Sequence, residues 1–466
     1  MKKNLLLTVA LGTALTANAQ KQWVPQATLI PVTGTTTKFA NDINVVDKDN
    51  VWAWFRSSVA TTNLRQYSYT TNGGTTWKPK TLTATGLTIT NLEIANMSVI
   101  DSNYAFASLY PPAATATNQG IYKTVNGGLS WTKSTVGKFT AGSSFVNWVH
   151  FWDKAKGVCM GDPANGGFEI YTTADSGTTW TRIDTTMMPV LIPTDVDEYG
   201  IVNLFDAQPN GLVWFGTNHG RLFKSTDYGM TWTVSASGFS ALGNTTQAFT
   251  TIQFKNDTVG VIVSQHVTSN QVDTVNVQLT IDGGATFTKW NYAGQWNPSD
   301  VCFVPGTNNV ITVNSLQLAP AFTYQVGSTI STDGGATFGY QDSINLLTSV
   351  AFVNDTVGYA GGSVSSAGGS KGVYKWADAP LVKLASVVAA TNSLSVYPNP
   401  ANNVLNVLVP SKKAQVIVYN MLGEMVYTTA VNDGRLTLDI TNYTSGAYVV
   451  QVIDGKTKLT KKFIKE

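Results

Sequence analysis

The stretch TTNGGTTW, residues 70–77, is the first of six short segments that decide the fold of this chain. Each segment follows the pattern Ser/Thr-x-Asp/Asn-x-Gly-x-x-Trp/Phe, and we refer to the six as the boxes. The other five are TVNGGLSW (124–131), TADSGTTW (173–180), STDYGMTW (225–232), TIDGGATF (280–287) and STDGGATF (331–338). They recur every 49–55 residues. A period of about fifty residues in a strand-rich chain indicates a propeller or a solenoid.

A second motif, two apolar strands around a polar turn, alternates with the boxes. Alternating β-branched and aromatic residues on either side of Asp, Asn or Gly turns are typical of hairpins. The seven copies span residues 43–55, 97–109, 149–161, 202–216, 252–263, 301–313 and 350–362. Because one further strand enters each box and another leaves it, every unit has four strands. The sequence therefore predicts an all-β fold, with a seven-bladed β-propeller over residues 20–376.

The seventh unit lacks its last strand. The segment GVYKWAD (372–378) supplies a third strand, and no box follows it. Near the start of the chain, QWVPQ (22–26) is similar to TWKPK (76–80) at the end of the first box. We therefore expect residues 22–26 to pair with residues 373–376 and close the ring, which would remove two open sheet edges.

Each position of the box is expected to have a structural role. The Asp or Asn side chain would accept hydrogen bonds from backbone N–H groups two residues on, and the Gly would supply the positive φ of the turn. The closing aromatic ring would be buried between neighbouring blades. The structural residues predicted in this way are Asn72, Asn126, Asp175, Asp227, Asp282, Asp333, Trp77, Trp131, Trp180 and Trp232.

The N-terminus has the features of an export signal, which we place at residues 1–19. Two lysines precede an apolar run over residues 5–15, and Ala-Asn-Ala at 17–19 fits a cleavage site. The run is too short to cross a bilayer and no later stretch is long enough, so no transmembrane segment is expected. Residues 20–393 carry a small excess of acidic side chains, which argues against nucleic acid as a partner.

The chain has two cysteines, Cys159 and Cys302. They fall in the third and sixth units, which a ring would hold far apart. We expect two buried, unpaired thiols in strands and no disulfide.

Residues 394–466 form a second predicted domain, joined to the propeller by a linker over residues 377–393. Short alternating strands between Asn, Gly and Pro turns indicate a small immunoglobulin-like β-sandwich. Four segments carry a resemblance: YPNP (397–400), NMLGEMV (420–426), LDITNYTSGAYVVQV (438–452) and KLTKKFIK (458–465).

These segments resemble the type A sorting domain of the type IX secretion system of Bacteroidetes. The resemblance implies that the secretion machinery is a partner, through residues 394–466. It also implies passage across the outer membrane, followed by release or by attachment to the outer cell surface. An ordinary adhesive module of the same fold is the alternative.

The boxes resemble the Asp-box (BNR) repeats of sialidases, sortilin-type receptors, some xyloglucan-degrading enzymes and the photosystem II stability/assembly factor-like proteins. The stretch FWDKAKGVCMGDPANGGFEIYTTADSGTTW (151–180) is most similar to the last group. The resemblance covers about residues 23–376 and implies the fold. Because the shared motif is scaffold, it implies little about function.

The loop-rich rim opposite the boxes is the expected ligand-binding face. Aromatic side chains in its loops are expected to contact the ligand: Trp148, Tyr199, Trp290 and Trp296. A glycosidase would need two carboxyl groups roughly 5–9 Å apart, and the candidates on this rim are Glu93, Asp162 and Asp195. The acidic loop 195–198 is also considered as a structural calcium site. No other cofactor is expected.

A sialidase is not expected, because its mechanism needs three arginines around the substrate carboxylate. The propeller segment has only Arg56, Arg65, Arg182 and Arg221. The favoured expectation is a secreted, non-enzymatic propeller that binds a glycan or a protein. The alternative is a polysaccharide-degrading glycoside hydrolase, and an assembly chaperone for an envelope complex is a third hypothesis.

Overall fold

The computed structural model forms two compact units, Met1–Ala379 and Pro380–Glu466, which we describe separately. The residues that the structure describes are 21–32, 36–59, 62–112, 117–135, 139, 145–192, 198–239, 247–268, 271–315, 326–365, 371–378, 394–409, 411–455 and 457–466.

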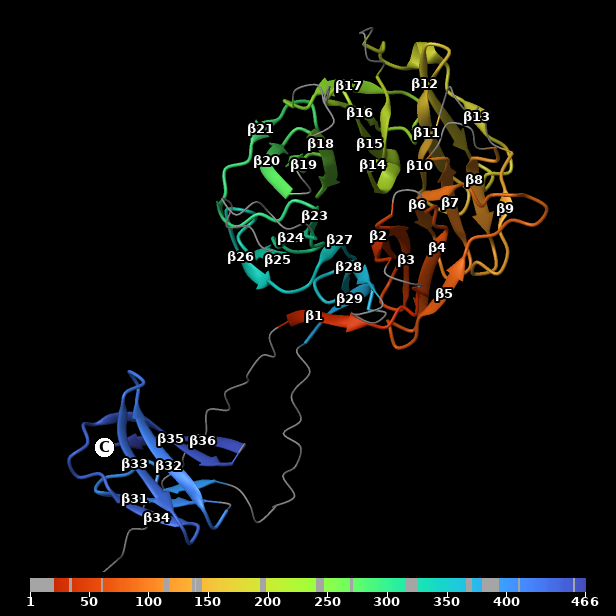
Figure 1. The fold of residues 1–466 in the computed structure, drawn as a ribbon. Helices are drawn as coiled ribbons and strands as arrows, with labels where there is room; N and C mark the ends of the chain where they lie inside the picture. Colours follow the sequence, from red (N-terminus) through yellow and green to blue (C-terminus); the bar gives the residue numbers. More distant parts are fainter. Residues whose placement is uncertain are drawn as a thin grey trace, which may run out of the picture. The chain divides into compact units, whose positions relative to one another are not determined.

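The first unit is a ring of seven blades with four antiparallel strands each, so the predicted propeller is confirmed (Figure 1). A short pairing of Lys38 and Phe39 with Val364 and Ser363 joins the first and last blades into one sheet, and the sixth blade has a fifth strand. Blade 1 is β2(Lys38–Val45), β3(Asn50–Ser57), β4(Gln66–Thr71) and β5(Lys78–Thr81). Blade 2 is β6(Glu93–Val99), β7(Ala105–Tyr110), β8(Gly120–Thr124) and β9(Thr132–Lys133). Blade 3 is β10(Val146–Phe151), β11(Gly157–Ala164), β12(Gly167–Thr173) and β13(Thr181–Arg182).

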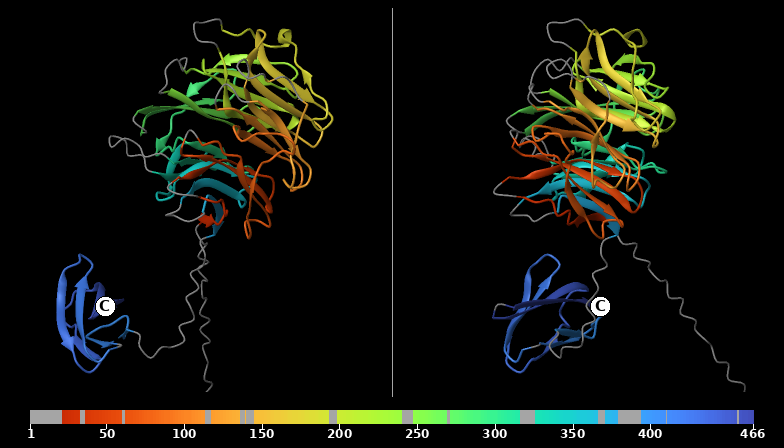
Figure 2. Two further views of the ribbon diagram at one scale, coloured as in Figure 1. Left: turned by 45° about the vertical axis from the view of Figure 1, so that its right-hand side comes forward. Right: turned by 90° about the vertical axis from the view of Figure 1, so that its right-hand side faces the viewer.

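Three further blades follow in the same order around the ring, as the views in Figure 2 also show. Blade 4 is β14(Gly200–Gln208), β15(Leu212–Thr217), β16(Arg221–Ser225) and β17(Thr233–Ala236). Blade 5 is β18(Gln247–Phe254), β19(Gly260–Thr268), β20(Gln271–Thr280) and β21(Thr288–Lys289). Blade 6 is β23(Asp300–Phe303), β24(Val310–Asn314), β25(Gly327–Ser331) and β26(Thr337–Asp342), with β22(Ala293–Gly294) added in parallel to β26.

Blade 7 is completed by the start of the chain, as the sequence predicts. It consists of β27(Leu347–Phe352), β28(Gly358–Val364), β29(Val373–Asp378) and β1(Lys21–Gln26). Strand β1 pairs antiparallel with β29 and places Trp23 opposite Trp376. The Trp23 indole N–H also donates to Ser328 Oγ of blade 6 at 2.8 Å. The two ends of the ring are therefore held together by a ladder and by a buried aromatic pair.

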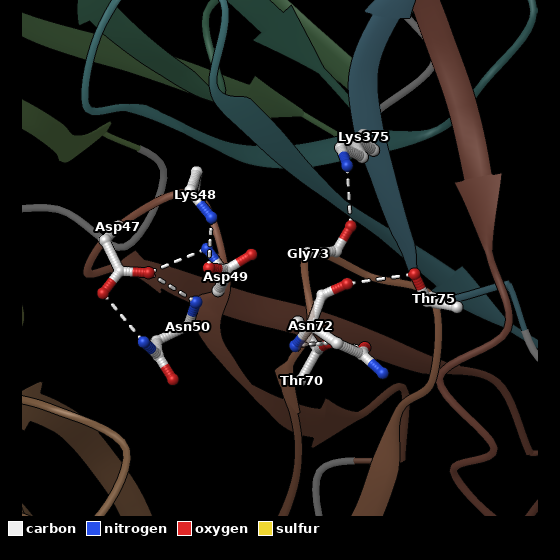
Figure 3. A network of polar contacts seen from close by, with 9 residues as sticks. All are labelled: Asp47, Lys48, Asp49, Asn50, Thr70, Asn72, Gly73, Thr75 and Lys375. Atoms are coloured by element: carbon white, nitrogen blue, oxygen red, sulfur yellow. Dashed lines mark hydrogen bonds and ion pairs between the residues drawn. The ribbon is translucent and has the colours of Figure 1, made fainter.

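The boxes form the turns between the third and fourth strands, and Figure 3 shows the first of them. Thr70 Oγ1 donates to Asn72 Oδ1 at 2.9 Å and accepts the Gly74 N–H at 3.0 Å. Asn72 Oδ1 also accepts the Thr76 N–H at 2.9 Å. The same three bonds occur in the other five boxes.

This geometry corrects one detail of the sequence analysis. The acidic or amide side chain accepts the N–H four residues on, because the hydroxyl two residues before it lies between the side chain and the nearer amides. The box glycine has the positive φ that was expected, between 71° and 93° in the six boxes.

The closing aromatic ring of each box lies against the preceding blade. Trp131 of blade 2 is 2% exposed, and its indole N–H donates to the Tyr67 hydroxyl of blade 1. Trp77 packs in the same way on Tyr359 of blade 7, and Trp232 packs among residues of blade 3. Trp180 is only partly buried. These rings fill the wedges between sheets that diverge from the central axis.

Both cysteines are free and buried, as expected. Cys159 lies in β11 and Cys302 in β23. Each occupies a small apolar position in a blade core.

The second unit is a β-sandwich. One sheet contains β30(Ser395–Tyr397), β31(Val404–Leu408) and β34(Arg435–Asp439). The other contains β33(Met425–Val431), β32(Ala414–Asn420), β35(Gly446–Asp454) and β36(Thr457–Lys465). Alternate residues of both sheets form one apolar core that includes Leu405, Val418, Val450 and Phe463. Among the described residues of the whole chain, no helix has the length and apolar character needed to cross a membrane.

Candidate ligand-binding site at the centre of the ring

The innermost strand of each blade is irregular at one common level. In six blades, the register of the first strand against the second shifts there, and in blade 6 both Pro298 and Asp300 pair with Val313. Such bulges re-aim side chains away from the sheet. Five of the seven bulges, in blades 1, 4, 5, 6 and 7, direct polar residues into the central channel.

The channel contains two cavities, which we call the upper and the lower cavity. The upper cavity, about 290 Å³, lies on the loop-rich rim, where the first strands begin and the second strands end. The lower cavity, about 310 Å³, lies further along the first strands towards the boxes. Six residues line both: Asn41, Asn203, Leu204, Thr250, Ser299 and Thr348.

The upper cavity is mostly polar. Besides the six shared residues, it is lined by Arg56, Ile201, Val202, Gln265 and Ser315. Arg56 is its one basic side chain, and no hydrogen bond or ion pair within the described part of the chain engages that guanidinium. Gln265 Oε1 is buried and has no hydrogen-bond partner among the described residues. The cavity thus offers amide, hydroxyl and guanidinium groups to a ligand.

A side-chain bridge spans the channel between the two cavities. Asn203, which has a φ of 58°, lies in a bulge of four residues, Ile201–Leu204, at the start of β14. Its Nδ2 donates to Asp42 Oδ2 of blade 1 at 3.0 Å. Blades 1 and 4 are three positions apart in a ring of seven, so the bond crosses the channel.

The lower cavity holds three carboxyl groups that the sequence analysis did not single out. Burial in the narrow channel raises the pKa of Asp206 to about 7. It also raises the pKa of Asp300 to about 7, with a further increase from the neighbouring charge of Asp42. Burial raises the pKa of Asp42 as well, and lowers that of His150 to about 4. The sequence feature that could have identified these residues is an aspartate within the otherwise apolar first strand of a blade.

These carboxyl groups join the innermost strands of neighbouring blades. Asp206 Oδ2 accepts the Phe254 N–H of blade 5 at 2.6 Å. Asp300 Oδ2 accepts the Val350 N–H of blade 7 at 2.9 Å. An asparagine makes the equivalent bond between blades 2 and 3, where Asn96 Oδ1 accepts the Val149 N–H at 2.9 Å. The lower cavity is therefore the structural hub of the ring.

The catalytic candidate Glu93 lies on the loop-rich rim, half-buried at the start of β6. Burial raises its pKa, while the hydroxyl of Tyr110 and the nearby charge of Arg56 lower it. The Tyr110 O–H donates to Glu93 Oε2 at 3.1 Å. A raised pKa fits a general acid, but the groups that contact Glu93 within the described residues include no second carboxyl group.

The candidate Asp162 has a structural position at the junction of blades 3 and 4. Its Oδ1 accepts Asn147 Nδ2 at 2.7 Å and the Gly200 N–H at 3.1 Å. Burial raises its pKa to about 6. Within the described residues, no hydrogen bond joins it to Glu93.

The candidate Asp195 lies outside the described residues, as does Asp197. Their neighbour Glu198 is buried and forms an ion pair with Arg221. It also accepts the Thr217 hydroxyl at 2.7 Å. No group of three or more His, Cys, Asp or Glu suited to a metal ion occurs among the residues described. A calcium ion on this loop stays a prediction.

The structure corrects the expectation for three of the four aromatic contact residues. Trp148, Trp290 and Trp296 are 0%, 7% and 0% exposed, because each packs in the core between blades. They cannot present a ring to a ligand. Tyr199 is 45% exposed at the entry to β14 and is the remaining aromatic candidate. The alternating apolar residues around these tryptophans are the sequence feature from which their burial could have been predicted.

The fold and the channel define a β-propeller protein with an added β-sandwich. Residues 395–466 match the family model of the secretion system C-terminal sorting domain. The protein is therefore a propeller that the type IX secretion system exports across the outer membrane, to the cell surface or beyond. No curated protein sequence matches the chain.

Solved structures of propellers are similar to the chain at low identity. YCF48 from Cyanidioschyzon merolae is 15% identical, with a TM-score of 0.46, over 76% of this chain and 99% of that one. PorZ of the type IX secretion system of Porphyromonas gingivalis is 13% identical, with a TM-score of 0.44, over 90% of this chain and 58% of that one. A GH74 xyloglucanase from Xanthomonas campestris is 10% identical, with a TM-score of 0.29, over 88% and 66%. We draw no functional argument from likenesses of this size.

Proposed function

We propose that the propeller binds a glycan at the upper cavity of its channel, outside the cell or on its surface. The observation that carries the proposal is the ring of bulges, which turns polar side chains of five blades towards one point. A bulge interrupts a ladder of hydrogen bonds and re-aims a side chain, and bulges are over-represented next to functional sites.

The chemistry of the cavity fits a polyhydroxylated ligand. Asn41 and Gln265 offer amides, and Ser315 offers a hydroxyl, all of which can both donate and accept, as sugar hydroxyls do. The hydroxyls of Ser299 and Thr348 donate to Asn314 Oδ1 and to the Ala40 carbonyl and keep lone pairs that can accept from a ligand. The cavity volume of about 290 Å³ lies at the lower end of the range for small-ligand sites. A protein ligand is less well supported, because such interfaces have a broad apolar centre.

Binding is favoured over hydrolysis because the carboxyl groups near the channel already have partners. Asp42, Asp206 and Asp300 accept backbone N–H groups of the propeller itself. Asp162 is likewise held by Asn147 and Gly200. A glycosidase needs one carboxyl group free to give a proton and a second free to attack or to activate water.

The test is a glycan array probed with the mature chain, residues 20–466. We expect defined glycans to bind, and Arg56→Gln and Thr348→Val to reduce their binding. The control is Arg435→Gln, an exposed arginine of the sorting domain. Equal binding by wild type and both cavity variants would place the site elsewhere, and binding of a protein ligand alone would contradict the proposal.

A further inference from the structure

The upper cavity has a floor, and the floor is the bulge Ile201–Leu204 of blade 4. We infer that the cavity receives the end of a glycan chain, held by its terminal sugar, and not a stretch from the middle of a chain. This inference rests on the proposed function. The inference adds that the protein recognises the end of the glycan, and that Asn203 determines this preference for the chain end.

The bulge of blade 4 differs from those of the other blades. In blades 1 and 5, the register shift accommodates a single residue, Asn41 or Thr250. In blade 4 the ladder between β14 and β15 jumps from Gly200 to Phe205 and leaves four residues unpaired. The extra length lets this segment extend into the channel.

Asn203 fixes the extended segment in place. Its left-handed backbone, with φ of 58°, is a conformation that asparagine adopts more readily than most residues. Its amide then reaches Asp42 on the far side of the ring at 3.0 Å. Two side chains in direct contact therefore span the channel, and on our inference they stop a sugar chain at this level.

The lining residues agree with a partition at this level. Asn203 and Leu204 line both cavities, whereas Ile201 and Val202 line only the upper one, and Phe205 and Asp206 line only the lower one. Successive residues of one strand thus pass from the upper cavity, through the floor, to the lower cavity. On this inference, the ligand enters the upper cavity from the loop-rich rim.

A pocket of this kind has a consequence for the bound chain. The volume of about 290 Å³ lies at the lower limit of ligand pockets, so on this inference the cavity receives only the terminal part of the chain. The remainder of the chain must leave through the entrance by which it came. Hydroxyl groups of the terminal ring would face the amides and hydroxyls of Asn41, Gln265 and Thr348, and the floor would exclude any substituent beyond it.

The experiment measures how many protein molecules bind to one glycan chain as the chain becomes longer. The ligands are soluble glucans, xylans, mannans and chitin oligosaccharides, together with their soluble polymers. For the glycan class that binds, recognition of the chain end predicts that one protein binds to each chain, whatever its length. Because longer chains have fewer ends per unit mass, the amount of protein bound at equal mass of glycan should fall as the chains become longer. Recognition of internal units predicts several proteins per long chain and constant binding at equal mass. Isothermal titration calorimetry with the mature chain measures both quantities.

Two variants test the role of the floor. Asn203→Gly keeps a residue that tolerates a positive φ but removes the bridge, and we expect it to weaken binding about 5- to 10-fold, the equivalent of about one hydrogen bond. Asn165→Gly is the matched control, because Asn165 has the same φ of 58° in an exposed turn of blade 3.

Each outcome has a distinct meaning. One protein per chain, with loss of affinity only in Asn203→Gly, supports the inference. Several proteins per long chain would overturn the inference and leave glycan binding standing. An absence of binding to all four classes and to the array would overturn both proposals. If Asn203→Gly fails to fold, the stoichiometry of the wild type still decides.

Discussion

Asn203 Nδ2 lies 3.0 Å from Asp42 Oδ2, and this hydrogen bond joins blade 4 to blade 1 across the centre of the ring. No strand ladder connects these two blades. The bond offsets part of the cost of burying Asp42, whose pKa burial raises. Asp42 in turn raises the pKa of Asp300 on blade 6. The charge of Asp42 therefore favours the protonated form of Asp300.

The stability of the propeller is expected to fall as pH rises from 6 to 8, where the loss from Asp206 and Asp300 exceeds the opposite contribution of His150, whose pKa is lowered to about 4. Asp206 and Asp300 have folded pKa values of about 7, above the value of about 3.9 for an unfolded aspartate. The folded state therefore binds more protons over this range, and each group lowers the free energy of unfolding as it ionises. We expect a loss on the order of 1–2 kcal/mol per group, measured by urea unfolding at several pH values.

Asp300→Asn separates this effect from other causes. The variant cannot ionise at this position, so its slope of stability against pH is expected to be shallower, whatever its stability at one pH. Asp355→Asn, at an exposed turn of blade 7, should leave the slope unchanged. A wild-type stability that rises or stays level between pH 6 and 8 would contradict the assignment.

The boxes predict the opposite dependence at low pH. Hydrogen bonds from the hydroxyl and N–H of the residue four positions on lower the pKa of Asp175, Asp282 and Asp333 to about 2. A lowered pKa stabilises the folded state fully above the unfolded value of about 4, and this contribution is lost as pH falls towards 2. The melting temperature should therefore drop over that interval.

The chain itself provides the control for this second prediction. Asparagine occupies the same position in two boxes, at Asn72 and Asn126, and makes the same bond to the amide four residues on. Asp175→Asn should accordingly fold and lose less stability than the wild type between pH 4 and 2. An unchanged acid dependence in this variant would show that the box carboxylates do not determine it.

Trp131→Ala is expected to cost about 3–5 kcal/mol, because it empties a buried position between blades 1 and 2. Trp131 is 2% exposed and lies edge-on to Tyr67 at a ring distance of 6.0 Å. Leu129→Ala changes the same box at a residue that is 73% exposed, and should cost under about 0.5 kcal/mol. Urea unfolding of both variants measures the difference in the free energy of unfolding. Similar losses in the two variants would show that the Trp131 indole does not stabilise the contact between the blades.

The sequence predicts the blades well because each period repeats the same local chemistry. Six boxes and seven hairpins report the same unit, and the similarity of residues 22–26 to 76–80 locates the missing strand. The channel was not predictable in this way. Asp206 and Asp300 are placed beside Asp42 only by the closure of a ring of blades, which no local pattern records. Trp148 was misassigned to a ligand because its position near a loop outweighed its apolar neighbours.

Lys375→Met tests the closure of the ring on its box side. Lys375 Nζ of blade 7 donates to the Gly73 carbonyl of the first box at 2.7 Å, as Figure 3 shows. Lys123 makes the equivalent bond to the Ser176 carbonyl of the third box at 2.8 Å. Loss of the ammonium leaves a carbonyl of the turn without its donor, and we expect a cost of about 1–2 kcal/mol.

Lys48→Met is the matched control for that variant. Lys48 is exposed and pairs with its neighbour Asp49 in the same region of Figure 3. An exposed pair of this kind contributes little, so the cost should stay below about 0.5 kcal/mol. Differential scanning calorimetry compares the two. Equal melting temperatures for Lys375→Met and Lys48→Met would mean that the cross-blade bond does not stabilise the ring.

Glu93→Gln decides between binding and hydrolysis at the loop-rich rim. Glu93 lies half-buried on this rim, and burial raises its pKa in the direction that suits a general acid, although the Tyr110 hydroxyl that it accepts at 3.1 Å acts against this. It is not among the residues that line the upper cavity. We therefore expect the wild type to release no reducing ends from any glycan that it binds. Glu93→Gln should change the affinity by less than about twofold, because glutamine retains an acceptor for Tyr110. Release of reducing ends by the wild type, abolished in Glu93→Gln with affinity preserved, would identify Glu93 as a catalytic acid and replace the binding proposal with a hydrolase.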